Sequence, residues 1–153
     1  MSTRRKFALF WYQLVALASL SVGLVYILSR AFTAYHKDAL GVSWEDLNEE
    51  TQTLLLALMD VGGGGMVALF VLLMALNEIP FRRGERWARY VIPVGILALY
   101  VPTLIATLNV ACKTPANPPW YGALAACAAA FIGLLLDRPW SNSDEAKREQ
   151  LAQ

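Results

Sequence analysis

Long apolar stretches alternate with shorter polar ones along this chain. A helix that crosses a bilayer core of about 30 Å needs roughly 20 mostly apolar residues. Four stretches have this character: 7–29, 53–76, 90–111 and 121–136. The fourth is the shortest, and Trp120 and Trp140 flank it where aromatic rings favour the membrane interfaces. The pattern predicts an all-α integral membrane protein, a four-helix antiparallel bundle that forms one transmembrane domain over residues 1–153.

Composition and charge support this class. The chain is 57% hydrophobic and 16% charged, which is too apolar for an ordinary soluble domain. A net charge of +1 leaves no basic face for nucleic acid once the helices are placed, so we expect membrane lipids to be the surroundings and no nucleic acid partner.

Basic residues predict the orientation. Three of them, Arg30, Lys37 and Lys113, fall on one side of the predicted membrane domain. The other ten fall on the opposite side: Arg4, Arg5, Lys6, Arg82, Arg83, Arg86, Arg89, Arg138, Lys147 and Arg148. The positive-inside rule therefore predicts a multi-pass protein of the inner or plasma membrane with both termini in the cytoplasm.

The segment 30–52 connects the first two spans on the outer side. Helical spacing continues past Ser29 to Gly41, and Ser43 then reads as an N-cap with Asp46 three residues later. The segment is expected to form a helical hairpin above the membrane. The alternative is a short helix lying flat at headgroup level. Residues 141–153 form a polar cytoplasmic tail.

The second span contains a segment that is unfavourable to place in a membrane helix. It consists of Asp60 followed by Gly62, Gly63, Gly64 and Gly65. A carboxylate inside the hydrocarbon costs roughly 2.5–3.5 kcal/mol on insertion scales and normally faces a protein interior or a wet cavity. Glycines allow close helix approach in membranes. The segment is therefore expected to be a site or a tight crossing.

Polar groups of other helices are expected near Asp60. His36 lies at the outer end of the first helix, and Asn109 differs in height from Asp60 by only about 6–8 Å of helical rise. Tyr100 and Thr103 lie on one face of the third span. These five residues are the predicted ligand-binding set. The alternatives are that Asp60 is purely structural and that the threonines bond only their own helix.

The fourth span carries rows of small residues that include Gly122, Ala126 and Ala130. Such rows let helix backbones approach closely. Together with the glycines of the second span, they predict tight packing and a homo-oligomer.

Several kinds of chemistry are not indicated. The chain has one histidine and no Cys-x-x-Cys motif, so the sequence predicts no metal site, no cofactor and no disulfide-exchange activity. An enzyme is less expected than a binding or structural protein.

Three blocks carry a resemblance: 35–41 (YHKDALG), 80–87 (PFRRGERW) and 114–120 (TPANPPW). The residues of these blocks and the four-span layout resemble those of small bacterial membrane proteins of unknown activity, and the layout is similar to that of the DoxX-like group. The resemblance implies a four-span bundle and carries over no catalytic residue.

The function expected from these observations is binding of a small amphipathic or lipid-like molecule in an outward-facing intramembrane cavity. One alternative is a structural or accessory membrane subunit that acts through helix packing and its outer hairpin. Another is an oligomeric transporter coupled to protons or cations.

Overall fold

All regular secondary structure in residues 2–140, the part of the chain that the computed structural model describes, is helical. In order, its elements are α1 (Thr3–Leu28), α2 (Ala34–Leu40), the 3-10 turn η1 (Trp44–Asp46), α3 (Glu49–Leu76), the π-helical turn η2 (Asn77–Phe81), α4 (Arg86–Lys113) and α5 (Trp120–Asp137). Within this range four helices are long and apolar enough to cross a membrane. The prediction of an all-α fold is confirmed, and the four long apolar helices agree with the prediction of a multi-pass membrane protein. The predicted polar tail, 141–153, lies outside the described residues.

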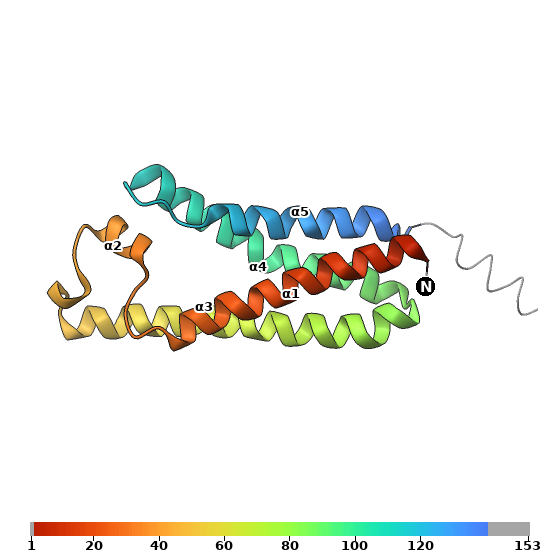
Figure 1. Cartoon of the computed structure of the whole chain (residues 1–153), viewed down its shortest axis with the longest axis horizontal. Helices are drawn as coiled ribbons and strands as arrows, with labels where there is room; N and C mark the ends of the chain where they lie inside the picture. Colours follow the sequence, from red (N-terminus) through yellow and green to blue (C-terminus); the bar gives the residue numbers. More distant parts are fainter. Residues whose placement is uncertain (1, 141–153) are drawn as a thin grey trace, which may run out of the picture.

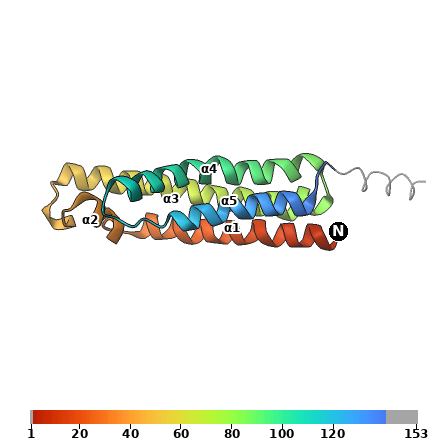
Figure 2. The same cartoon turned by 90° about the horizontal axis from the view of Figure 1, so that it is seen from above.

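The four long helices lie side by side along the length of the molecule (Figures 1 and 2). α1 packs mainly against α3 and α5, and α4 packs mainly against α5. α3 and α4 make far fewer contacts with each other, although they are consecutive in the chain. The start of α1 and the end of α5 lie at the same end of the molecule, and α2 lies near the opposite end (Figure 1).

Local sequence explains where several helices begin and end. Ser2 Oγ accepts a hydrogen bond from the Arg5 backbone N–H at 3.4 Å at the start of α1. Asn48 Oδ1 accepts one from the Thr51 N–H at 3.0 Å at the start of α3. Gly41 ends α2 with φ 70°, a left-handed conformation that glycine adopts without steric cost.

Two helix boundaries differ from the sequence prediction. α1 ends at Leu28, so residues 34–40 form a separate helix and not an extension of the first one. The backbone is extended at Ser29 and again at Thr33, which caps the new helix. Beyond the predicted end of the second span at residue 76, the helical run continues through Pro80 as the π-helical turn η2.

The apolar core occupies the half of the bundle nearer the N-terminus of α1. Its largest fully buried apolar side chains are Tyr12, Phe81, Leu73, Ile92 and Ile96. Along α1 the last buried residue is Gly23, and α4 has no buried residue after Tyr100. The part of the bundle nearer α2, called the outer end for its place in the molecule, is therefore less tightly closed by helix packing than the part that contains the core.

α1 and α3 approach each other closely at Gly23 and Gly63. A Cβ on Gly63 would lie 2.8 Å from the Gly23 carbonyl oxygen, and a Cβ on Gly23 would lie 2.8 Å from the Gly63 oxygen. Neither carbonyl can move without shifting a helix backbone. The glycine run of the second span therefore includes a tight crossing.

The other small residues have different surroundings. A Cβ on Gly62 would make ordinary contact with the Tyr26 ring at 3.7 Å, whereas one on Gly64, Gly65 or Gly122 would meet nothing within 4 Å. Ala126 and Ala130 of α5 are buried inside the single chain. These two residues therefore pack against other helices of the same chain. The homo-oligomer stays a prediction.

Replacing Gly63 by Ala should destabilise the fold by about 1–3 kcal/mol, the usual cost of overpacking, because the new methyl group meets backbone on α1. The matched control Gly64→Ala adds the same methyl group in open space and should be neutral or stabilising. Reversible unfolding in mixed detergent micelles measures both. Equal stability of the two variants would contradict the crossing at Gly63.

Candidate functional site

The predicted ligand-binding residues do not gather in one place. Asp60 and Asn109 are both exposed on the surface of their helices. Met59, the residue before Asp60, is only 5% exposed, so the buried face of α3 turns away from the carboxylate. Asp60 therefore points outward from the bundle.

Tyr100 and Thr103 already have partners inside the protein. The hydroxyl of Tyr100 lies 2.8 Å from that of Ser19 in the buried core. Thr103 donates to the Leu99 carbonyl at 2.8 Å, one turn earlier on its own helix. The hydroxyl of Thr103 therefore serves its own helix, and that of Tyr100 joins α4 to α1.

A hollow of about 170 Å³ lies at the outer end of the bundle, between α1, α2 and α3. Its lining residues are Tyr26, Phe32, His36, Leu55, Leu58 and Met59. A broader and more open hollow of about 550 Å³ lies along the outer turns of α3, lined by Glu49, Glu50, Thr53, Leu54 and Ala57. Of the five predicted ligand-binding residues, His36 lines the smaller hollow, and none of the other four lines either one. We favour the smaller hollow as a site because three separate elements converge on it.

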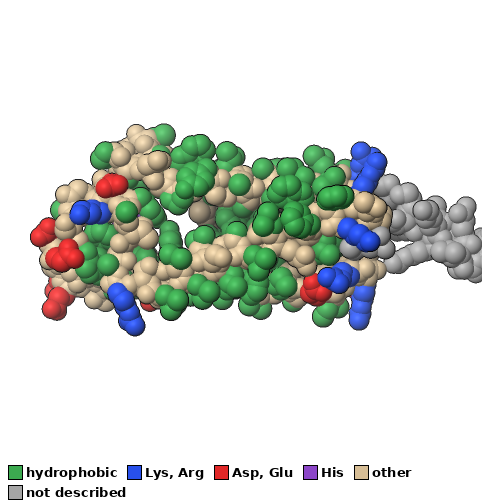
Figure 3. Space-filling model, in the orientation of Figure 1, with side chains coloured by type: hydrophobic (Ala, Val, Ile, Leu, Met, Phe, Trp, Pro, Cys, Tyr) green, Lys and Arg blue, Asp and Glu red, His purple; other side chains and the backbone are tan. Residues whose placement is uncertain are grey.

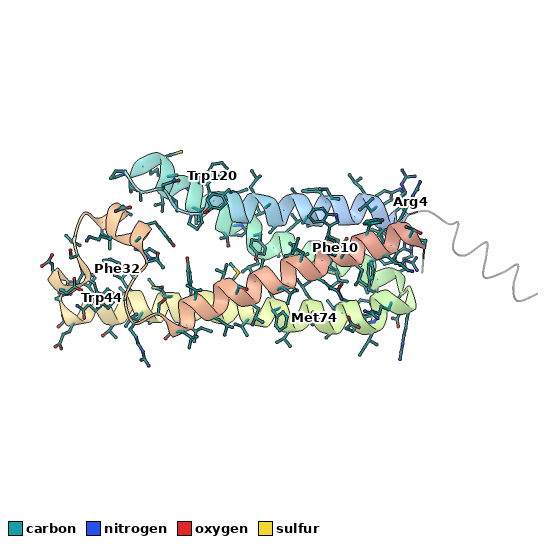
Figure 4. All side chains as sticks on the ribbon, viewed as in Figure 1. Arg4, Phe10, Phe32, Trp44, Met74 and Trp120 are labelled. Atoms are coloured by element: carbon teal, nitrogen blue, oxygen red, sulfur yellow. The ribbon has the colours of Figure 1, made fainter. Side chains whose placement is uncertain are left out.

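Aromatic contacts hold the walls of this hollow. The Tyr26 hydroxyl of α1 lies 2.9 Å from the Tyr35 hydroxyl of α2. Phe32 packs edge-on against Trp44 with ring centroids 5.2 Å apart, and Figure 4 shows these two side chains near each other at the outer end of the molecule. Burial raises the pKa of Tyr35 above its ordinary value, and its hydrogen bond to Tyr26 adds to the shift. Tyr35 is therefore a neutral hydroxyl group at physiological pH.

The imidazole of His36 is fixed by its own helix terminus. Its Nδ1 accepts a hydrogen bond from the Thr33 backbone N–H at 3.2 Å, which completes a capping box at the start of α2. The ring also lies against that of Tyr35, with centroids 4.0 Å apart. Burial lowers the pKa of His36, which favours the neutral ring.

A second polar cluster lies at the opposite end of the bundle, around Asp137. Arg89 Nε donates to Asp137 Oδ2 at 2.6 Å, and Arg89 also donates to the Asp137 carbonyl at 2.8 Å. Arg5 Nε donates to Asp137 Oδ1 at 3.2 Å. The Asp137 side chain is fully buried, and it joins the starts of α1 and α4 to the end of α5. We interpret this cluster as a structural ionic connection.

The sequence alone does not predict this cluster. Arg5 and Arg89 contribute to the charge asymmetry that predicts orientation, and Asp137 lies just past the fourth predicted span. The one available signal is a lone acid directly after an apolar helix, on the side where the arginines gather. Figure 3 shows the outcome on one face: basic groups gather mainly at this end, acidic groups mainly at the other, and apolar side chains between them.

Two further polar side chains are buried without a hydrogen-bond partner among the described residues. They are the Tyr12 hydroxyl and both amide atoms of Asn77. The ring of Tyr12 is packed tightly against α5, where a Cβ on Gly133 would lie 2.5 Å from it. In residues 2–140 no group of three His, Cys, Asp or Glu side chains is placed to hold a metal ion.

Comparisons of the chain with family models, curated proteins and solved structures give no match. The geometry of the chain itself is therefore what supports a function. The resemblance to the DoxX-like group stays a prediction.

Replacing Asp137 by Asn should lower stability by about 3–5 kcal/mol, the usual cost of breaking a buried ion pair, because Arg89 and Arg5 lose their shared carboxylate. Glu78→Gln is the control, since it removes the exposed Arg82–Glu78 pair (3.1 Å) and should cost less than about 1 kcal/mol. Denaturant titration in micelles compares the two. A loss at Asp137 no larger than that at Glu78 would contradict the structural role.

Proposed function

We propose that this protein binds a small amphipathic molecule in the hollow at the outer end of its helix bundle. The observation that carries the proposal is the hollow itself, in which apolar side chains of α3 face aromatic side chains from α1, α2 and the segment between them. Ligand sites are typically concave and mostly apolar, with a few fixed polar groups. Here the fixed polar group is the imidazole of His36.

The proposed topology places this hollow on the outer side of the membrane. The four helices then form an antiparallel bundle in the inner or plasma membrane, and both chain termini lie in the cytoplasm. The excess of basic residues at the Asp137 end supports this orientation.

A cysteine placed at Gly84 should be protected from a label that cannot cross the membrane, and labelling from outside would refute the orientation.

Asp60 supports a second candidate, an accessory subunit that packs against another membrane helix. Its carboxylate is exposed in the apolar part of α3, and an acid facing lipid is costly. A partner helix that covers Asp60 would remove this cost, and Gly64, which has open space around it one turn further on, would allow a close approach.

Filling the hollow should abolish ligand retention. Leu55→Phe puts a larger side chain into the hollow, whereas Val61→Phe puts the same ring on a surface position that is 75% exposed and lines neither hollow. Mass spectrometry of compounds extracted from the purified proteins should find an amphipathic compound with the wild type and with Val61→Phe, and lose it with Leu55→Phe.

Asp60→Asn separates the two candidates, since it keeps the shape and removes the charge. Binding in the hollow predicts that this variant retains the compound as the wild type does. If Leu55→Phe has no effect on retention, or if the wild type retains nothing, the binding proposal is wrong. If Asp60→Asn instead releases a co-purifying protein, the accessory role is supported.

A further inference from the structure

The hydrogen bond that caps α2 determines which nitrogen of His36 carries the proton. A backbone N–H can only donate, so Nδ1, which accepts from the Thr33 N–H and also lies 3.0 Å from the Thr33 hydroxyl, must offer its lone pair. In a neutral imidazole the proton is then on Nε2. No described residue accepts a hydrogen bond from this Nε2–H. His36, which lines the hollow, thus has an N–H donor on Nε2 that no described residue uses.

The remaining walls of the hollow carry no formal charge. Besides His36 they consist of two aromatic rings, two leucines and Met59. The two hydroxyls of Tyr26 and Tyr35 bond to each other. A charged ligand group would therefore enter an apolar site without a counter-ion, which is unfavourable. The lowered pKa of His36, caused by burial, is consistent with a neutral site.

The size of the hollow limits what can enter it. Its volume is about 170 Å³. An apolar cavity of roughly 150 Å³ is large enough to bind benzene, whereas drug-sized ligands occupy about 300–1,000 Å³. One small ring or a short chain end fits. The rest of an amphipathic molecule would remain outside in the lipid, next to Leu58, which is 61% exposed.

We propose that the hollow selects a small, uncharged ring or chain end that bears a hydrogen-bond acceptor, such as a carbonyl oxygen, and that the Nε2–H of His36 donates to this acceptor. The proposal rests on the proposed function and names the ligand class of the same site. The hollow should bind two other classes of ligand more weakly. Purely apolar molecules leave the Nε2–H donor unpaired, and cations find no negatively charged partner there.

Three probes of similar size test the ligand class in lipid nanodiscs: acetophenone, which has a carbonyl acceptor; ethylbenzene, which has none; and benzylammonium, which is a cation. Titration is followed through the NMR signal of the His36 ring nitrogens. Acetophenone should bind about three- to tenfold more tightly than ethylbenzene, the range for one net hydrogen bond. Benzylammonium should bind most weakly.

Two variants of His36 keep the cap of α2 and change the donor, with binding followed through the methyl signal of Met59. His36→Gln retains both an acceptor for the Thr33 N–H and an N–H donor, so the preference for acetophenone should persist. His36→Glu retains the capping box but offers only acceptors, so the preference for acetophenone over ethylbenzene should disappear. Helix content by circular dichroism checks that both variants fold.

The outcomes distinguish the two proposals. If no probe binds the wild type, both the proposed function and the ligand class are wrong. If the probes bind the wild type but ethylbenzene or benzylammonium matches acetophenone, the hollow binds ligands and the donor role of His36 is wrong. Persistence of the acetophenone preference in His36→Glu also overturns the donor role.

Discussion

The close approach of α1 and α3 at Gly23 and Gly63 determines the geometry of the outer half of the molecule. Each glycine leaves room for a carbonyl oxygen of the other helix, 2.8 Å from where a Cβ would be. One turn beyond Gly23, Tyr26 then lies against α3, where a Cβ on Gly63 would be 3.0 Å from the Tyr26 Cβ. Tyr26 in turn bonds to α2 through Tyr35. The wall of the hollow thus depends on this crossing.

The two ends of the bundle are held by different forces. Near Asp137, buried charges and a dense apolar core tie α1, α4 and α5 together. Toward the outer end the core stops, and a short helix and aromatic contacts cover α1 and α3 instead. Regions with fewer buried contacts open at lower free energy. A ligand site at the outer end is therefore built on the part of the fold that can adjust most easily.

Sequence pattern alone predicts much of the fold and little of the site. The four spans and the end of α2 at Gly41 follow from hydropathy and glycine conformation, both local properties. The direction in which Asp60 points does not, because neighbouring residues on a helix differ by about 100°. Met59 is buried and Asp60 exposed for this reason. The pairing of Arg89 with Asp137 joins positions 48 residues apart, which no local pattern specifies.

His36 is the one predicted ligand-binding residue that lines the hollow. Its companions there are apolar side chains such as Leu55 and Met59, which look like ordinary span residues in the sequence. A small hollow lined by ordinary apolar residues has no recognisable sequence pattern, whereas an acid such as Asp60 within an apolar span is easily recognised in the sequence. This difference explains why the polar constellation is the obvious expectation and the hollow is not.

The most direct test is to locate a bound ligand by crystallography. Crystals of the protein with 4′-bromoacetophenone give an anomalous signal from the bromine atom, which marks the position of the ring. Binding in the hollow predicts a bromine peak among Leu55, Leu58 and Met59, with the carbonyl oxygen within hydrogen-bond distance of His36 Nε2. A peak beside Asp60 on the outer surface of α3, with none in the hollow, would contradict it.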